Sequence, residues 1–187
     1  MSKFSKAVVI TGALGGIGQA ICQEFSRRGW KVIPLDIRMG PNDKNNFSDF
    51  DLVRFVRDQE YRDDNAAKIK TLLPKKLQRV VLVNNAAVQK LAPAKDLTLD
   101  DWEETLTVNL LAPFFMSQSL FSELSSTTGS VINIGSIHSS LTKPDFTAYA
   151  SSKGALTNLT RSLALEWAPH GISVNAIRPA AIDTPML

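Results

Sequence analysis

Short apolar runs alternate along the chain with longer segments in which apolar residues recur every three or four positions. Uninterrupted apolar runs are typical of strands buried on both faces, as in a parallel sheet, whereas recurrence at three and four residues indicates helices. The strands predicted by this pattern are residues 7–10, 31–35, 52–56, 80–83, 130–136 and 173–177. One predicted helix begins directly after the glycine cluster at 12–18. Three more occupy residues 63–73, 98–124 and 149–167. The alternation predicts an α/β fold, a doubly wound parallel sheet between two layers of helices.

Two segments depart from this alternation. Residues 37–50 contain Gly, Pro and three Asn and show no helical periodicity, so a loop is predicted where a doubly wound fold normally has a helix. Pro113 interrupts the predicted helix 98–124, because it cannot donate to the carbonyl of Asn109 four residues earlier. We expect a kink at this point and a free carbonyl at Asn109.

The helix that contains Pro113 also predicts an assembly. It opens with the capping residue Thr98 and early negative charge, and from Leu106 to Leu124 it is apolar on nearly every side. A sheet covers only one side of a helix, so the second apolar side has to be buried elsewhere. We expect a homodimer or homotetramer whose interface includes residues 106–124 and 149–167.

Composition and charge exclude several classes of protein. The chain has 187 residues, of which 44% are hydrophobic, enough for one globular domain spanning residues 1–187. The net charge of +3 is scattered and forms no basic stripe, so nucleic-acid binding is not expected. There is no apolar run of about 18 residues and no signal-peptide core after Met1. With the single cysteine Cys22, these features predict a cytoplasmic protein in a reducing compartment, with no membrane contact and no metal site.

The first candidate for chemistry is the turn after the first predicted strand, where Gly12, Gly16 and Gly18 follow Thr11 with the spacing G-x-x-x-G-x-G. A strand, a glycine turn and a helix place a helix N-terminus against a phosphate. Asp36 ends the next predicted strand, about 20 residues after the turn, where a carboxylate can accept hydrogen bonds from an adenosine ribose. An ordinary glycine-rich turn and an aspartate that only caps a strand end are the structural alternatives.

The second candidate is Tyr149-x-x-x-Lys153, which places a phenol and an ammonium on one face of a predicted helix. A nearby ammonium favours the phenolate, so the spacing predicts a tyrosine pKa below the usual value of about 10. Such a tyrosine can exchange protons at neutral pH. The pair alone is a weak signal, but Ser136 ends a predicted strand thirteen residues earlier and Asn109 lies at the predicted kink.

In this order and spacing the motifs resemble the short-chain dehydrogenase/reductase family, single-domain branch, over essentially all of the chain. The resemblance implies a Rossmann fold of seven parallel strands that oxidises alcohols or reduces carbonyls with NAD(H) or NADP(H). It implies a catalytic tetrad in which Ser136 binds the substrate oxygen, Tyr149 transfers the proton, and Lys153 tunes Tyr149 and binds ribose. The tetrad residues are Asn109, Ser136, Tyr149 and Lys153. The implied cofactor-binding residues are Thr11, Gly12, Gly16, Ile17, Gly18, Asp36, Asp58, Asn84, Asn85, Ala86, Tyr149, Lys153, Pro179 and Thr184.

Of the two cofactors, NAD(H) is expected to be preferred and NADP(H) is less favoured. Asp36 would repel the 2′-phosphate of NADP(H), and neither Gly15 nor Ile37 supplies the positive charge that this phosphate needs. Arg38 is the exception, since its side chain can swing toward the phosphate.

The chain also departs from the pattern of the family. Ala87 and Ala180 stand where glycine is usual, and a helix is missing between the second and third predicted strands. The sequence stops at Leu187, where the resemblance implies a substrate lid, a helix and a seventh strand, so we expect the polypeptide to continue. An active oxidoreductase on a small alcohol or carbonyl is favoured because all four tetrad side chains are present. The alternative is a non-catalytic dinucleotide-binding or scaffold protein of the same fold.

Overall fold

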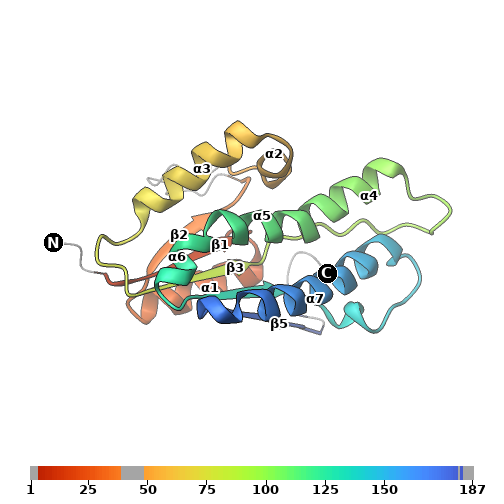
Figure 1. The fold of residues 1–187 in the computed structure, drawn as a ribbon. Coiled ribbons are helices and arrows are strands. Elements are labelled where there is room, and N and C mark those ends of the chain that lie inside the picture. Colours follow the sequence, from red (N-terminus) through yellow and green to blue (C-terminus); the bar gives the residue numbers. More distant parts are fainter. Residues whose placement is uncertain (1–3, 39–48, 181, 183–187) are drawn as a thin grey trace.

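The computed structural model describes residues 4–38, 49–180 and 182 (Figure 1). Within them, five strands form one parallel sheet in the order β2-β1-β3-β4-β5. The strands are β1 (Lys6–Thr11), β2 (Lys31–Leu35), β3 (Arg79–Asn84), β4 (Ser130–Ile134) and β5 (Ser173–Ile177). These five were predicted from the apolar runs, and the parallel α/β architecture is confirmed. The runs are apolar throughout because the central strands are covered on both faces.

Helices lie on both faces of the sheet and give it three layers. On one face, apolar residues of every strand pack against α3 (Gln59–Leu72), α5 (Ala112–Ser119), α6 (Phe121–Ser126) and α7 (Thr147–Trp167). On the other face, strand residues such as Val8 and Val81 pack against Ile21 and Phe25 of α1 (Gly16–Arg27). Burial raises the pKa of the Cys22 thiol in α1 to about 11, which keeps the sulfur in its inert form.

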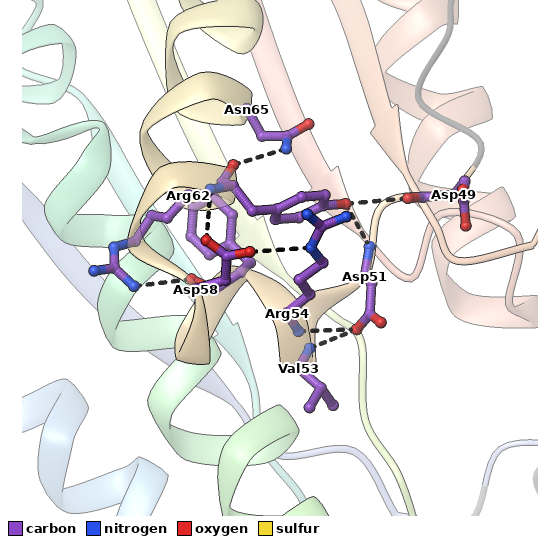
Figure 2. Close-up of polar contacts among 9 residues, drawn as sticks. Asp49, Asp51, Val53, Arg54, Asp58, Arg62 and Asn65 are labelled. Carbon is purple, nitrogen blue, oxygen red and sulfur yellow. Dashed lines mark hydrogen bonds and ion pairs between the residues drawn. The ribbon is translucent and has the colours of Figure 1, made fainter.

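The predicted strand at 52–56 is wrong, because these residues belong to the helix α2 (Leu52–Arg57). The carboxylate of Asp51 accepts hydrogen bonds from the backbone N–H groups of Val53 and Arg54, which caps the helix (Figure 2). The apolar residues at 52, 55 and 56 also fit the helical spacing of three and four, and Phe55 is fully buried. The sheet of the described residues therefore has one strand fewer than predicted.

This correction also changes the setting of Asp58. Its carboxylate accepts a hydrogen bond from the N–H of Tyr61 at the start of α3 and pairs with Arg54 (Figure 2). Asp58 thus caps a helix and does not end a strand. The role of Asp58 in cofactor binding, which the resemblance implies, stays a prediction, although the strand predicted before Asp58 is a helix.

Pro113 marks a break in helical geometry, as predicted, although the break is a π-helical turn and not a simple kink. Between α4 (Leu99–Leu106) and α5, residues Thr107–Leu111 form the π-helical turn η1, and Pro113 follows in the first turn of α5. Proline is tolerated there because its missing N–H is not needed at the start of a helix. The capping residue predicted at the start of α4 is confirmed, and the structure adds a capping box, in which the side chains of Thr98 and Asp101 accept from each other's backbone N–H groups. The free carbonyl at Asn109 stays a prediction.

Two other expectations fall partly or wholly outside the described residues. Of the predicted loop 37–50, the described positions 37, 38, 49 and 50 are neither helix nor strand, and the remainder lies outside. Thr184 also lies outside. In the part of the chain that the structure describes, no helix combines the length and the apolar character that crossing a bilayer requires.

Candidate active site

The site lies at the carboxyl edge of the sheet, where the chain order reverses. From β1 the sheet continues to β2 on one side and to β3 on the other, and a crevice forms outside the strand ends at such a switch point. The loops after β1 and β3 are tied together across it. The N–H groups of Asn85 and Ala86 donate to Thr11 Oγ1 at 3.0 and 3.1 Å. The Asn85 side-chain amide donates to the carbonyls of Thr11 and Gly12 at 3.1 and 2.9 Å.

Glycine is required at two positions of the turn, because neighbouring backbone leaves no room for a Cβ. Gly12 has φ +62°, and a Cβ at this position would lie 2.7 Å from Ala86 Cα. A Cβ on Gly18 would collide with the carbonyl oxygen of Gly12. No side chain caps the first turn of α1 and no acidic residue lies in it, so the helix N-terminus is suited to an anion. The turn therefore fits the pyrophosphate of a dinucleotide.

The crowding at Gly18 predicts that Gly18→Ala lowers the free energy of unfolding by about 1–3 kcal/mol, because the added methyl meets fixed backbone. Gly154→Ala in α7 is the matched control: its Cβ would lie 3.7 Å from the Ser139 carbonyl oxygen, an ordinary contact. That variant should be stabilised by up to about 1 kcal/mol, the helix propensity gained over glycine. Urea denaturation of both variants measures the difference, and equal effects would contradict the steric argument.

Asp36, the predicted ribose-binding residue, lies beside the glycine turn. Its Oδ2 accepts a hydrogen bond of 2.9 Å from the N–H of Leu14 within the turn. Burial raises the pKa of the carboxyl, but hydrogen bonds from Arg38 and from backbone N–H groups outweigh burial and hold the pKa below its usual value. The carboxylate is thus ionised and fixed next to the glycine turn, in the position that would suit a ribose.

The structure brings Ser136, Tyr149 and Lys153 together in a buried cluster. Ser136 follows β4 and lies close enough to the Tyr149 hydroxyl to affect its pKa, while Tyr149 and Lys153 lie one turn apart on α7. The Nζ of Lys153 donates to the carbonyl of Ile134 at 2.8 Å and lies 5.7 Å from the centre of the Tyr149 ring. Tyr149 is 8% exposed and Lys153 2% exposed. The three predicted side chains therefore share one desolvated corner of the crevice.

The sign of the tyrosine pKa shift differs from the prediction. Burial raises the pKa of Tyr149, and the hydrogen bond with Ser136 opposes this without reversing it. Burial also lowers the pKa of Lys153 to about 8, because a buried ammonium loses its hydration. The spacing of the two residues predicted their proximity correctly, but burial decides the direction of the Tyr149 pKa shift.

Asn109 positions the other groups. Its Oδ1 accepts from the N–H of Val88, and its Nδ2 donates to the Val88 carbonyl, each at 2.9 Å. Nδ2 also donates to Ser152 Oγ at 3.0 Å, and Ser152 Oγ in turn donates to the carbonyl of Tyr149 at 2.7 Å. This side chain, which is fully buried, thereby joins the loop after β3 to the turn of α7 that carries the phenol. Sequence reasoning missed Ser152, although its place between Tyr149 and Lys153 was a usable signal.

Ser136 is oriented by its own backbone neighbourhood. Its Oγ accepts a hydrogen bond of 3.2 Å from the N–H of His138, within the 3₁₀ turn η2 (Ile137–Ser139). The carbonyl of Pro179, after β5, accepts from the N–H of Ile137 at 3.1 Å and holds that segment against the turn. The N–H of His138 occupies one acceptor position of the serine oxygen, and the hydroxyl proton can still be donated to an oxygen acceptor.

An aromatic cluster lies beside the phenol. The ring of His138 lies 4.6 Å from that of Phe146 and 6.4 Å from that of Tyr149, centre to centre, and Phe146 and Tyr149 are 6.0 Å apart. His138 and Phe146 therefore border the place where a substrate would meet Tyr149.

Asn84 contributes to the sheet. Its side-chain amide donates to Asn133 Oδ1 at 2.8 Å, and Asn133 donates to Thr160 Oγ1 at 2.9 Å. This buried chain of hydrogen bonds links β3, β4 and α7, so Asn84 holds β3 in place beside the neighbouring strand β4.

Comparisons with known proteins agree with this geometry. A sequence profile of the family described as short chain dehydrogenase matches residues 6–187. The chain is 38% identical to protein FixR of Bradyrhizobium diazoefficiens, over 97% of this chain and 69% of that protein. It is 36% identical to an NAD-dependent glycerol dehydrogenase of Listeria innocua, over 97% of this chain and 72% of that protein.

The fold comparison gives the same result. A short-chain dehydrogenase/reductase from Brucella ovis, solved in complex with a partially ordered NAD, superposes with a TM-score of 0.84 and 35% identity. The match covers 95% of this chain and 84% of that one. Among the solved structures similar to the chain, one contains NAD and another contains NADP.

Proposed function

Because the chain belongs to the short-chain dehydrogenase/reductase family of oxidoreductases, we propose that it interconverts a secondary alcohol and a carbonyl, with NAD(H) as the preferred cofactor. The observation that carries the proposal is the buried cluster of Ser136, Tyr149 and Lys153, at the same carboxyl edge of the sheet as the glycine turn. The nicotinamide of the cofactor supplies or accepts the hydride when it is bound.

Tyr149 is proposed as the acid/base group. Because burial raises its pKa, the phenol is protonated at neutral pH, which is the form that gives a proton to a carbonyl oxygen during reduction. Alcohol oxidation requires the reverse transfer, from the substrate hydroxyl to the phenolate. Ser136, whose Oγ already accepts from the N–H of His138, donates its own proton to the substrate oxygen and holds it against the phenol.

Lys153 is proposed to bind the ribose beside the nicotinamide. Among the described residues its one hydrogen-bond partner is the carbonyl of Ile134, and a protonated amine has three donors. Two N–H groups of the ammonium are thus free for ribose hydroxyls. Positive charge on this buried amine also favours the phenolate in the oxidation direction.

The relevant test is binding and turnover measured on the same preparation. NADH binding is followed by nicotinamide fluorescence, and turnover by absorbance at 340 nm with polyols, hydroxy acids and simple secondary alcohols, and with the matching carbonyls. The proposal predicts tight NADH binding and turnover with at least one substrate class, with a higher kcat/KM for NAD(H) than for NADP(H). Binding without turnover across the whole panel would favour the scaffold alternative, which no comparison supports.

We also propose that the chain works as a homodimer or homotetramer. Leu111 in η1 and Leu165 in α7 are 40% and 80% exposed, and both lie in the segments that the apolar pattern assigns to an interface. Light scattering at micromolar concentration should give twice or four times the chain mass of 20.5 kDa. Leu165→Glu should shift the mass toward the monomer. Leu141→Glu, which changes an exposed leucine outside these segments, should not, and a monomeric wild type would refute the assembly.

A further inference from the structure

A lysine lies against an aromatic ring beside the phenol of Tyr149. The ammonium of Lys143 is 4.3 Å from the ring centre of Phe146 and lies over that ring. Phe146 is 7% exposed, and its ring centre lies 6.0 Å from that of Tyr149. One buried ring is therefore in contact with both the cation and the proposed acid/base group.

The segment that carries Lys143 is tied to the site at both of its ends. The N–H of Ala92, on the loop after β3, donates to the carbonyl of Asp145 at 3.3 Å. At the other end, Nδ1 of His138 lies 3.1 Å from the carbonyl of Leu141. Because a carbonyl only accepts, Nδ1 is the donor in this hydrogen bond. These contacts hold the turn of Lys143 beside the crevice.

The charge of Lys143 is not neutralised within the part of the chain that the structure describes. None of the ion pairs there includes Lys143, although Asp145 is two positions away. Lys90, on the loop after β3, by contrast pairs with Glu104 at 2.7 Å. Contact with an aromatic face favours a cation but does not use its N–H donors. The ammonium of Lys143 can therefore attract an anion that enters the crevice.

These groups suit two different parts of one substrate. Ser136 and Tyr149 are proposed to hold the reacting oxygen. The buried ring of Phe146 next to Tyr149 offers an apolar surface to a short alkyl chain, and the ammonium over that ring offers N–H donors to a carboxylate. A neutral alcohol or ketone would leave this cation without a partner.

We propose that Lys143, held over Phe146, is a specificity-determining residue that selects substrates with a carboxylate, namely hydroxy acids and the corresponding oxo acids. The inference rests on the proposed function, because it requires hydride transfer at the same site. In the reduction, the carbonyl carbon gains the hydride and the carbonyl oxygen gains the proton of Tyr149. The carboxylate takes no part in the reaction and stays bound to Lys143.

The first test compares oxo acids with their methyl esters, which keep the carbon chain and remove the charge. Pyruvate, acetoacetate and levulinate place the carboxylate progressively farther from the reacting carbonyl. Turnover at 340 nm should give a kcat/KM at least about fivefold higher for one or more of these acids than for its ester. Added salt should reduce this preference.

Lys143→Met removes the charge and keeps a side chain that packs on an aromatic ring. It should lower kcat/KM for the preferred acid about fivefold, mainly through KM, because the lost contact is remote from the reacting carbon. The ester should be unaffected. Lys143→Arg keeps the charge and should retain most of the preference for the acid.

A second measurement does not depend on turnover. Pentanoate has a carboxylate but no carbonyl to reduce, and pentanamide is its uncharged counterpart. Their binding to the NADH-bound protein is followed by the change in nicotinamide fluorescence. Pentanoate should bind more tightly than pentanamide to the wild type, and Lys143→Met should remove this difference.

Lys76→Met is the matched control, because it removes an exposed lysine from the loop before β3, at the opposite edge of the sheet from the site. It should leave the preference for the acid unchanged. Equal turnover of acids and esters, turnover of neutral substrates alone, or an equal loss for acid and ester in Lys143→Met would overturn the role of Lys143, while the proposed function stands. If the wild type turns over no alcohol or carbonyl of either panel, the proposed function fails and this inference fails with it.

Discussion

Replacing Tyr149 with phenylalanine is expected to lower kcat by about 10²–10⁴-fold, the usual contribution of a general acid/base group, with NADH affinity nearly unchanged. Only one hydroxyl is lost. The ring keeps its place in the cluster with His138 and Phe146, so the fold and the surface facing the cofactor are preserved. The measurement is steady-state turnover at 340 nm beside NADH binding by fluorescence.

Tyr61→Phe provides the control for this experiment, since Tyr61 is the other tyrosine of the chain. Its hydroxyl donates to the carbonyl of Asp49 and accepts from the N–H of Asp51, at the α2–α3 end of the molecule. This variant should lose about 1 kcal/mol of stability with its hydrogen bonds and keep its kcat. Retention of more than a few per cent of kcat by Tyr149→Phe would show that the proton passes through another group.

Replacing Lys153 with methionine is expected to abolish turnover and weaken NADH binding, yet to change stability in a pH-dependent way. The folded state lowers the pKa of Lys153 from 10.5 to about 8. Below pH 8 the folded protein carries a buried ammonium that is less stable than the hydrated ammonium of the unfolded chain. Between pH 8 and 10.5 the unfolded chain binds more protons, so stability rises with pH as this penalty disappears. Methionine removes the penalty at every pH.

The measurement is the free energy of unfolding of both proteins by urea at pH 7 and pH 10. The difference, variant minus wild type, should be more positive at pH 7 than at pH 10 by about 2 kcal/mol. Loss of the hydrogen bond to Ile134 adds an offset that does not depend on pH and cancels in this comparison. Lys68→Met, on the exposed side of α3, is the control. If the difference is the same at the two pH values, burial does not lower the pKa of Lys153.

The strands of the sheet could be predicted well because a strand that is buried on both faces is apolar at every position. Every residue from Ala7 to Ile10 and from Val80 to Val83 is buried, and an uninterrupted apolar run predicts this state directly. Residues 52–56 are apolar in a pattern that fits a strand and a helix alike. The choice between the two depends on the cap from Asp51, one residue earlier, which the apolar pattern does not include.

The proximity of Tyr149 and Lys153 could be predicted from the sequence, but the directions of their pKa shifts could not. The spacing of Tyr149 and Lys153 fixes their distance along α7, while their pKa values depend on how completely other elements cover them. The partners of the site are equally remote in sequence: the carbonyl of Ile134 lies 19 residues before Lys153, and Val88 lies 21 residues before Asn109. The hydrogen bond that fixes Asp36 comes from the N–H of Leu14, 22 residues earlier.

Following a deuterium label tests the proposed hydride transfer directly. The protein is incubated with NADH carrying deuterium at the transferable position of C4 and with the carbonyl panel, and the alcohols formed are analysed by mass spectrometry. The proposed hydride transfer predicts an alcohol with one deuterium on the carbinol carbon, formed by the wild type and not by Tyr149→Phe. Bound NADH with no deuterated alcohol from any carbonyl, or equal deuterium transfer by the two proteins, would contradict it.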